Sequence, residues 1–384
     1  MSGPSAPFAS ELQTALQAVH AASQLTKSVL RSLKNNVGAE TKDDDSPVTI
    51  ADFAAQALLI CTLHAVFPDD RFIGEESADA LRRNEALADR VWNLVLRAKE
   101  RAYAQQDGKG DVQMPREGAD ALVRGFPASK EEMFERIDAG GKGQVTGQGR
   151  VWVMDPVDGT ATFMQGQQYA VALCLLVDGV QQVGVVGCPN LAFDVHGPLR
   201  ETRVHEDQVD EVGYGVILSA VKGHGTYIRS MQESELGEPR RIDLTSLPSK
   251  SPSDMNFVET TIGKTSLCQS EHKLVAETLG CSWPGTVVWS QQMKYAALTL
   301  GATDIMVRIP KTKERFTYIW DHVGGHILYQ EAGGLIRDFD GHAIDFSKGR
   351  QIKGDTNHGM IAAMPSIFDA VDKAVKDVLA KRGP

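Results

Sequence analysis

The sequence has few cysteines, no excess of positive charge and no long hydrophobic run. Its five cysteines are far apart and lack the Cys-x-x-Cys spacing of zinc and redox sites, so we expect reduced, mostly buried thiols. With 40 Lys and Arg against 50 Asp and Glu, the formal charge is −10, which argues against a nucleic-acid partner. No window approaches the roughly 18 apolar residues of a membrane span, and residues 1–10 do not resemble a signal peptide. We therefore expect a cytoplasmic protein without a membrane partner.

What the sequence does contain is typical of a folded protein. Its 384 residues are 42% hydrophobic and 23% charged, and this length suffices for two or three domains at roughly 150 residues each. No internal repeat is visible. We place one boundary at 205/206, with an α+β domain at 1–205 and an α/β domain at 206–384.

The sequence pattern of the first half predicts two helices followed by an antiparallel sheet. Apolar residues recur at helical spacing over 8–33, and a second helix is expected from Thr49 to Phe67. Short apolar runs bounded by Gly and Pro predict strands at 71–74, 150–154, 169–178, 182–188 and 213–218. Segment 79–149 is charged and contains several glycines, and its pattern predicts one helix around 81–104. We interpret this segment as a surface excursion.

The second half mixes helices and strands. Helical patterns cover 271–279, 294–300, 321–331 and 366–380. Strands are expected at 304–309 and 335–338. This alternation indicates an α/β half.

The hexapeptide from Asp155 to Thr160 follows an apolar strand and contains two carboxylates three residues apart. Asp155, Asp158 and the Val157 carbonyl between them offer three oxygens to one hard cation. Gly159 and Thr160 then begin a predicted helix whose N–H groups favour a phosphate. The structural alternative is a plain turn, since Asp, Pro and Gly are common turn residues.

Three further acidic motifs have structural alternatives of the same kind. Glu75, in Gly74-Glu75-Glu76-Ser77, follows a short predicted strand, where acids also favour a helix N-terminus. Thr49 and Asp52 have the spacing of a capping box, and Asp321 stands at the start of a predicted helix. Each motif alone is weak evidence for a metal site.

Taken together and in this order, the four motifs resemble the signature of the inositol monophosphatase superfamily of metal-dependent, lithium-sensitive phosphatases. The resemblance extends from about Leu12 to Ala380. It is closest to the fungal 3′(2′),5′-bisphosphate nucleotidases, as judged from Ser46-Pro47-Val48-Thr49, Phe67-Pro68-Asp69-Asp70, Gln292-x-Lys294-Tyr295 and Ile319-Trp320-Asp321-His322. It implies a layered α/β/α/β/α sandwich of the inositol monophosphatase/fructose-1,6-bisphosphatase type.

The resemblance also implies roles for individual residues. The metal ligands, expected to bind Mg²⁺, are Glu75, Asp155, the Val157 carbonyl, Asp158 and Asp321. Asp52 and Thr160 match the pair that activates water, and His322 is expected close to the metal ligands. The positions that match substrate-binding residues are Gly159, Thr160, Lys264, Lys294 and Arg308. The implied reaction is hydrolysis of 3′-phosphoadenosine 5′-phosphate, a small phosphorylated metabolite, to AMP and phosphate.

Some positions depart from the nucleotidase pattern and leave the substrate open. Ala161 and Gln165 stand where that branch commonly has Lys and Arg, and Gln291 stands where it often has Ser. The segment 262–268 lacks the histidine- and serine-rich pattern of the branch. The alternatives are a phosphatase of inositol or another polyol phosphate, and a catalytically inactive regulator. The intact acidic set argues against the inactive regulator, because uncompensated carboxylates that converge without use are costly.

Overall fold

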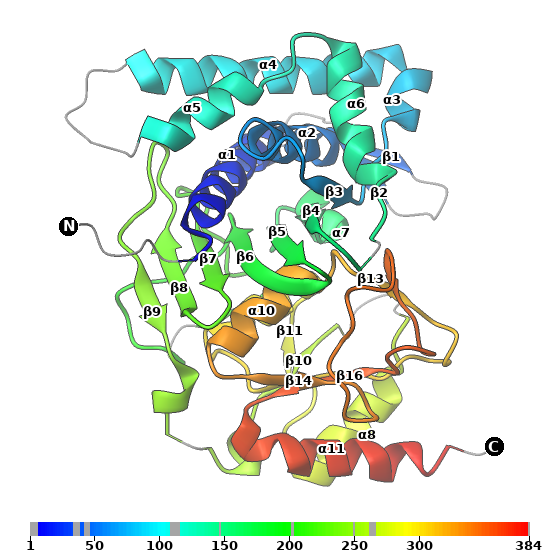
Figure 1. Cartoon of the computed structure of the whole chain (residues 1–384). Helices are drawn as coiled ribbons and strands as arrows, with labels where there is room; N and C mark the ends of the chain where they lie inside the picture. Colours follow the sequence, from blue (N-terminus) through cyan, green and yellow to red (C-terminus); the bar gives the residue numbers. More distant parts are fainter. Residues whose placement is uncertain are drawn as a thin grey trace.

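The chain folds into alternating layers of helices and sheets, as the computed structural model shows (Figure 1). The structure describes residues 7–33, 39–41, 47–107, 116–145, 147–200, 203–248, 250–260 and 266–382. A helix pair, a large sheet, a second helix pair, a small sheet and a last helix pair follow one another through the molecule. This is the α/β/α/β/α arrangement that the sequence analysis predicted. One additional helical layer covers its first face.

The first helix pair consists of α1 (Ala9–Leu33) and α2 (Ile50–His64). The buried residues of α1, such as Val19 and Leu25, recur at the three- and four-residue steps of an amphipathic helix. Every residue of α2 from Ile50 to Leu63 is buried, because α2 packs between α1, the large sheet and the additional helices. This helix ends at His64, three residues before the predicted end.

The large sheet has seven strands in the order β3-β4-β5-β6-β7-β8-β9. Strands β3 and β4 pair in parallel and all the others pair antiparallel. Their bounds are β3 (Arg71–Gly74), β4 (Arg150–Asp158), β5 (Ala170–Val177), β6 (Val180–Cys188), β7 (Val216–Val221), β8 (Gly225–Ser230) and β9 (Arg240–Ile242). Side chains alternate between the faces, so Trp152 and Leu173 pack under α1 and α2 while Val153 and Cys174 face the second half.

The predicted boundary at 205/206 divides the strands of this sheet. Strands β7, β8 and β9 follow residue 206 in sequence but continue the same hydrogen-bonded sheet. The chain leaves the sheet only after Ile242. Strand pairing is non-local, so local sequence patterns did not show that these strands continue the first sheet.

The segment from 79 to 141 forms four helices in the described part of the chain, where the sequence predicted one. They are α3 (Asp79–Arg83), α4 (Glu85–Asp107), α5 (Arg116–Gly125) and α6 (Lys130–Gly141). Val91, Val95, Met133 and Ile137 are fully buried in the core that α1, α2 and the sheet share. The interpretation as a surface excursion is therefore corrected: these helices bury the outer face of α2.

The second half builds a smaller sheet between helices. Strands β12 (Ile305–Arg308), β16 (Met360–Ala363) and β14 (Leu335–Arg337) pair antiparallel in this order. Helices α9 (Gln291–Thr299) and α10 (Val323–Glu331) lie between the two sheets, and α8 (Gln269–Leu279) and α11 (Pro365–Leu379) cover the small one. The short elements are α7 (Thr160–Met164), β1 (Ala39–Thr41), β2 (Pro47–Thr49), β10 (Val258–Glu259), β11 (Thr286–Val287), β13 (Thr317–Tyr318) and β15 (Gln351–Ile352).

Two expectations from composition can be compared with the structure. All five cysteines are free, and all except the partly exposed Cys268 are buried. Among the described residues, none of the helices combines the length and apolarity needed to cross a membrane.

Because Ile137 on α6 is fully buried, its replacement by alanine should destabilise the whole first half. Ile137→Ala should lower the free energy of unfolding by about 2–5 kcal/mol in urea titrations. Leu274→Ala, at a position on α8 that is 43% exposed, is the control and should cost less than about 0.5 kcal/mol. An equally small effect at Ile137 would show that the additional layer folds separately.

Candidate active site

A bulge at the end of β4 brings Asp155 and Asp158 together. Asp155 pairs with Ala172 and Asp158 with Ala170, so three steps along β4 match two along β5. In a regular strand, residues three apart face opposite sides of the sheet. The extra residue turns both carboxylates toward the same side. Strand β4 therefore extends through the motif, four residues beyond the predicted end at Met154.

The third carboxylate of the cluster comes from the second half of the chain. Oxygens of Asp155, Asp158 and Asp321 lie within 4.8 Å of one another. Asp321 stands just before α10, and its Oδ2 accepts hydrogen bonds from Thr317 Oγ1 at 2.9 Å and from the Tyr318 N–H at 3.4 Å. The site therefore forms where the two halves meet.

Glu75 and Asp52 lie beside this cluster. Gly74 pairs in parallel with Met154, so Glu75 and Asp155 follow neighbouring strands at the same edge of the sheet. Asp52 is in the first turn of α2 and is only 1% exposed. The charges of both residues raise the pKa of Asp155, which shows that they are close to it.

Burial and mutual repulsion raise the pKa values of the clustered carboxyl groups. Burial is the largest cause for Asp155, followed by the charge of Glu75 and then of Asp158 and Asp321. Burial raises the pKa of Asp158 to about 6, although hydrogen bonds from Ser290 and the Gln292 N–H oppose the shift. Burial, with the charges of Asp158 and Glu75, raises the pKa of Asp321 to about 7. The cluster is thus unfavourable in its ionised form without positive charge.

The donor atoms fit a hard divalent cation. The converging groups are carboxylates, without sulfur or imidazole, as Mg²⁺ and Ca²⁺ prefer. Asp155 Oδ1 is buried and has no hydrogen-bond partner among the described residues. Such an oxygen is costly to bury unless a proton, a hydrogen-bond donor or a cation satisfies it.

The second group of acidic residues with suitable spacing consists of Asp338, Asp340 and His342. Here Asp338 accepts hydrogen bonds from the backbone of Asp340 and His342 and from Asn357. Asp340 and His342 are exposed. These bonds satisfy Asp338 as part of a turn, and we assign no site there.

The residues after Asp158 adopt the expected turn into a short helix. Gly159 has φ +94°, and a Cβ there would lie 2.9 Å from Ser290 Cβ, so the backbone conformation and the space both require glycine. Thr160 begins α7, and its Oγ1 donates to the Val157 carbonyl at 3.2 Å. Helix α7 lies beside β2, the strand that leads directly into α2 and Asp52.

His322 contacts the segment that carries Asp321 without joining the acidic cluster. It is fully buried, with Nδ1 2.9 Å from the Tyr295 hydroxyl and Nε2 3.0 Å from Thr317 Oγ1. Burial lowers its pKa well below the usual value, so the ring is neutral. It thus helps to orient Thr317, which donates to Asp321.

The structure describes two of the three cations that the sequence assigned to substrate binding; Lys264 lies outside the described residues. Lys294 is 4% exposed and donates to Thr260 Oγ1, and burial followed by the charge of Arg308 lowers its pKa to about 8. Arg308 is partly exposed and donates to Gln291 Oε1. Lys294 is therefore not an ordinary surface lysine.

Sequence reasoning missed several residues around the site. Ser290 Oγ donates to Asp158 Oδ2 at 2.6 Å, and a cavity next to Arg308 is also lined by Arg315 and Thr317. Ser290 is the N-cap of α9, which the sequence signal of a capping serine could have revealed. Nothing in the local sequence distinguishes Arg315 from a solvated surface charge.

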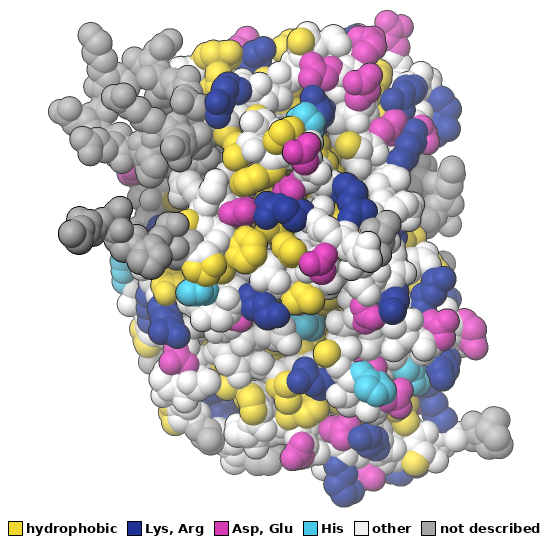
Figure 2. Space-filling model, in the orientation of Figure 1, with side chains coloured by type: hydrophobic (Ala, Val, Ile, Leu, Met, Phe, Trp, Pro, Cys, Tyr) yellow, Lys and Arg dark blue, Asp and Glu magenta, His cyan; other side chains and the backbone are white. Residues whose placement is uncertain are grey.

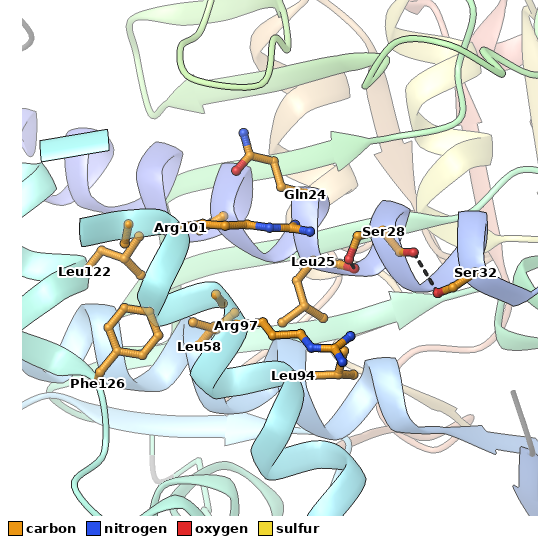
Figure 3. A pocket seen from close by; sticks show the side chains of 13 residues that line it. Gln24, Leu25, Ser28, Ser32, Leu58, Leu94, Arg97, Arg101, Leu122 and Phe126 are labelled. Atoms are coloured by element: carbon orange, nitrogen blue, oxygen red, sulfur yellow. Dashed lines mark hydrogen bonds between the residues drawn. The ribbon is translucent and has the colours of Figure 1, made fainter. Parts of the chain in front are cut away.

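A separate cavity of ≈ 240 Å³ lies among the helices of the first half (Figure 3). Leu25, Leu58, Leu94 and Phe126 are among its lining residues, with Arg97 and Arg101 of α4 also facing it. None of its lining residues is acidic or belongs to the cluster. It is therefore not part of the acidic site.

The oxygen-donor cluster, formed where the two halves of the chain meet, could hold a metal ion, and bound metal ions of this kind suit phosphate-ester chemistry. The chain matches the inositol monophosphatase family over residues 9–94 and 113–367 and belongs to it.

Curated relatives in this family are bisphosphate nucleotidases. The chain is 37% identical to the 3′(2′),5′-bisphosphate nucleotidase of Emericella nidulans over 362 residues, covering 94% of this chain and 96% of that one. It is 37% identical to the Schizosaccharomyces pombe enzyme over 379 residues, covering 97% of each chain. The resemblance seen in the sequence motifs is confirmed.

Solved structures support the fold. The IMPase of Thermotoga maritima has a TM-score of 0.56 at 16% identity, covering 97% of this chain and 100% of that one. The inositol monophosphatase of Anabaena has a TM-score of 0.53 at 18% identity, covering 97% of each chain.

The raised carboxyl pKa values predict how the stability of the cation-free protein depends on pH. Between the ordinary aspartate pKa of 3.8 and the raised values of about 6 for Asp158 and about 7 for Asp321, the folded state binds more protons than the unfolded state. The free energy of unfolding in chelator should therefore fall as pH rises from about 4 to about 7. Urea titrations across this range measure the slope.

Asp321→Asn is the matched variant for this measurement. It removes one titrating group and one repulsive charge, so the decline with pH should be shallower. If the free energy of unfolding fell equally with pH in both proteins, this would contradict an interaction between these carboxylates.

Proposed function

We propose that this protein is a Mg²⁺-dependent phosphatase that hydrolyses the 3′-phosphate of 3′-phosphoadenosine 5′-phosphate, giving AMP and phosphate. The observation that carries the chemistry is the convergence of Asp155, Asp158 and Asp321 within 4.8 Å. The chain is similar to bisphosphate nucleotidases over nearly its whole length, and this similarity supports the choice of substrate.

The residues that would hold Mg²⁺ are Glu75, Asp155, the Val157 carbonyl, Asp158 and Asp321. The buried, unpartnered Oδ1 of Asp155 and the raised pKa values of the cluster support this set. When bound, the cation would neutralise phosphate charge and make water a better nucleophile. The ligand set would span both halves of the chain.

Asp52 and Thr160 would manage the proton of the attacking water. Asp52 is buried at the start of α2, and α7, which begins with Thr160, lies beside the strand that precedes α2. Thr160 would orient the water through its hydroxyl, and Asp52 would accept the proton as the oxygen–phosphorus bond forms. The bond from phosphorus to the 3′-oxygen would then break, that oxygen would take a proton from solvent water to become the nucleoside hydroxyl, and Asp52 would return its proton to solvent.

Substrate contacts would come from both sides of the site. The backbone at Gly159 and Thr160 would bind the transferred phosphate. Arg308 and Thr317 line the same cavity, and the Thr317 hydroxyl donates a hydrogen bond to Asp321. Lys294 is close enough to Asp158 for their charges to interact. These positions would hold the nucleotide and its second phosphate, together with Lys264.

A second candidate is a phosphatase of inositol phosphate or another polyol phosphate. It is favoured by Ala161 and Gln165, which remove two positive charges expected of a nucleotidase beside the phosphate. A structural neighbour, SaIMPase-II, with a TM-score of 0.53 at 14% identity, was solved with inositol monophosphate bound.

The deciding experiment is phosphate release in Mg²⁺ from a panel of substrates. We expect the highest kcat/KM for 3′-phosphoadenosine 5′-phosphate, compared with its sulfonated analogue, inositol 1-phosphate and fructose 1,6-bisphosphate. Excess chelator should abolish turnover. A preference for inositol 1-phosphate would establish the second candidate, and full turnover in chelator would refute metal dependence.

Replacing Asp52 by asparagine tests its role as proton acceptor. The side chain keeps its shape, so Asp52→Asn should fold and bind Mg²⁺ while kcat falls about 10²–10⁴-fold. Circular dichroism and Mg²⁺ calorimetry verify folding and metal binding. Wild-type turnover would leave Asp52 with a structural role at the helix start.

Arg308→Ala tests the nucleotide assignment. Loss of a charge-assisted contact to the second phosphate should raise KM for 3′-phosphoadenosine 5′-phosphate at least about tenfold, with little effect on inositol 1-phosphate. Equal losses on both substrates would indicate a general defect of the site. No loss on the nucleotide would remove Arg308 from the substrate contacts.

A further inference from the structure

The four carboxylates assigned to the cation come from segments far apart in the sequence. They repel one another, so their spacing depends on contacts that oppose separation of these segments. Three polar side chains next to the cluster make hydrogen bonds to backbone atoms of these segments. They are Gln56, Gln292 and Arg350.

We propose that Gln56, Gln292 and Arg350 are positioning residues, which hold the acidic cluster at the spacing that binds a divalent cation. The proposal rests on the proposed function in taking Glu75, Asp155, Asp158 and Asp321 as cation ligands. The three side chains bond to backbone groups of these segments and are not among the proposed cation ligands or substrate contacts.

Gln292 joins the segments that carry Asp158 and Asp321. Its backbone N–H donates to Asp158 Oδ2. Its side-chain Nε2 donates to the carbonyl of Trp320 at 2.7 Å, and its Oε1 accepts from the Gly325 N–H, also at 2.7 Å. Trp320 directly precedes Asp321, and Gly325 lies in the first turn of α10. One fully buried residue thus fixes β4 against the start of α10.

Gln56 joins the segments that carry Asp52 and Glu75. It lies one helical turn after Asp52 on α2 and is fully buried. Its Oε1 accepts from the Glu76 N–H at 2.9 Å, while Nε2 donates to the Glu76 carbonyl at 2.6 Å and to the Ile137 carbonyl at 2.8 Å. Both backbone groups of the residue after Glu75 are therefore held by one amide.

This contact also explains Gly74 in the motif before Glu75. A Cβ on Gly74 would lie 2.3 Å from Gln56 Oε1, so only glycine leaves space for the amide. Gly74, directly before Glu75 in the sequence, therefore leaves the space that the Gln56 side chain occupies.

Arg350 joins the segments that carry Glu75 and Asp321. Its Nη2 donates to the Gly74 carbonyl at 2.7 Å, and its Nη1 donates to the carbonyls of Gly140 and Gly143 at 3.1 Å each. The guanidinium lies 4.6 Å above the ring of Trp320. It therefore contacts the residue before Glu75 and the residue before Asp321.

The chemistry of the amide makes this role specific. Gln292 and Gln56 each use one acceptor and at least one donor, and a glutamate of the same shape has no donor when it is ionised. Residues that orient metal ligands typically change metal affinity about 10–100-fold when they are mutated. Replacing Gln56 or Gln292 should therefore clearly raise the dissociation constant for the cation. Its effect on the stability of the fold should be smaller.

The test compares Gln292→Met with Gln168→Met. Gln168 is equally buried, and its amide donates to the carbonyls of Gln208 at 2.8 Å and Asn190 at 3.3 Å. In Mg²⁺ calorimetry, Gln292→Met should raise the dissociation constant at least about tenfold and Gln168→Met less than about twofold. Both should lower Tm in chelator to a similar extent. Equal dissociation constants for the two variants would overturn the proposal.

A double-mutant cycle tests whether Gln292 acts through Asp321. In an Asp321→Asn background, Gln292→Met should change the Mg²⁺ dissociation constant less than about threefold, because the ligand it positions is gone. A tenfold rise of the dissociation constant in both backgrounds would overturn the assignment that Gln292 acts through Asp321. Gln56→Met and Arg350→Met, paired with Glu75→Gln, extend the cycle to the other two contacts.

These measurements separate the proposal from the proposed function. Calorimetry reads cation binding without substrate. A wild-type protein that binds Mg²⁺ but releases no phosphate from any ester in the panel would refute the proposed function, while the ratio between Gln292→Met and Gln168→Met would still decide the positioning role.

Discussion

Mutual repulsion among buried carboxylates is the constraint on which the arrangement of this site depends. Burial and the charges of its neighbours raise the pKa of Asp155, and the same causes act on Asp321. Hydrogen bonds from Ser290 to Asp158 and from Thr317 to Asp321 favour the ionised forms. They offset only part of the cost, because the pKa values stay high. A divalent cation would stabilise this arrangement, which is unfavourable without positive charge.

The two sheets and the helices between them bring this charge together. Parallel pairing of β3 with β4 sets Glu75 beside Asp155, and the bulge in β4 turns Asp158 to the same side. Helices α9 and α10 lie between the sheets, and the segments that precede them supply Ser290 and Asp321. No single element contains the site. Its geometry depends on how accurately the layers are held against one another.

Positive charge comes from the second half. Lys294 is buried on α9, where Asp158, Glu259 and Glu206 favour its charged form against the effect of burial. Arg308 ends β12 and faces a cavity that Arg315 also lines. Positive charge beside the carboxylates would favour a ligand with more than one phosphate.

The sequence by itself determined the types of chemical group and the local elements. Hydrophobic periodicity predicted α1 and α11 nearly to their ends, and a short apolar run predicted β3. The order of the acidic motifs, through its resemblance to a known family, predicted Asp155, Asp158 and Asp321 as one set. Periodicity reports only local burial. Tertiary structure alone decided the features that depend on distant partners: the length and bulge of β4, the assignment of β7 to β9 to the first sheet, and the burial of Lys294. The contacts of Gln56 and Gln292 belong to the same class, because an amide in a sequence does not show which backbone it will bind.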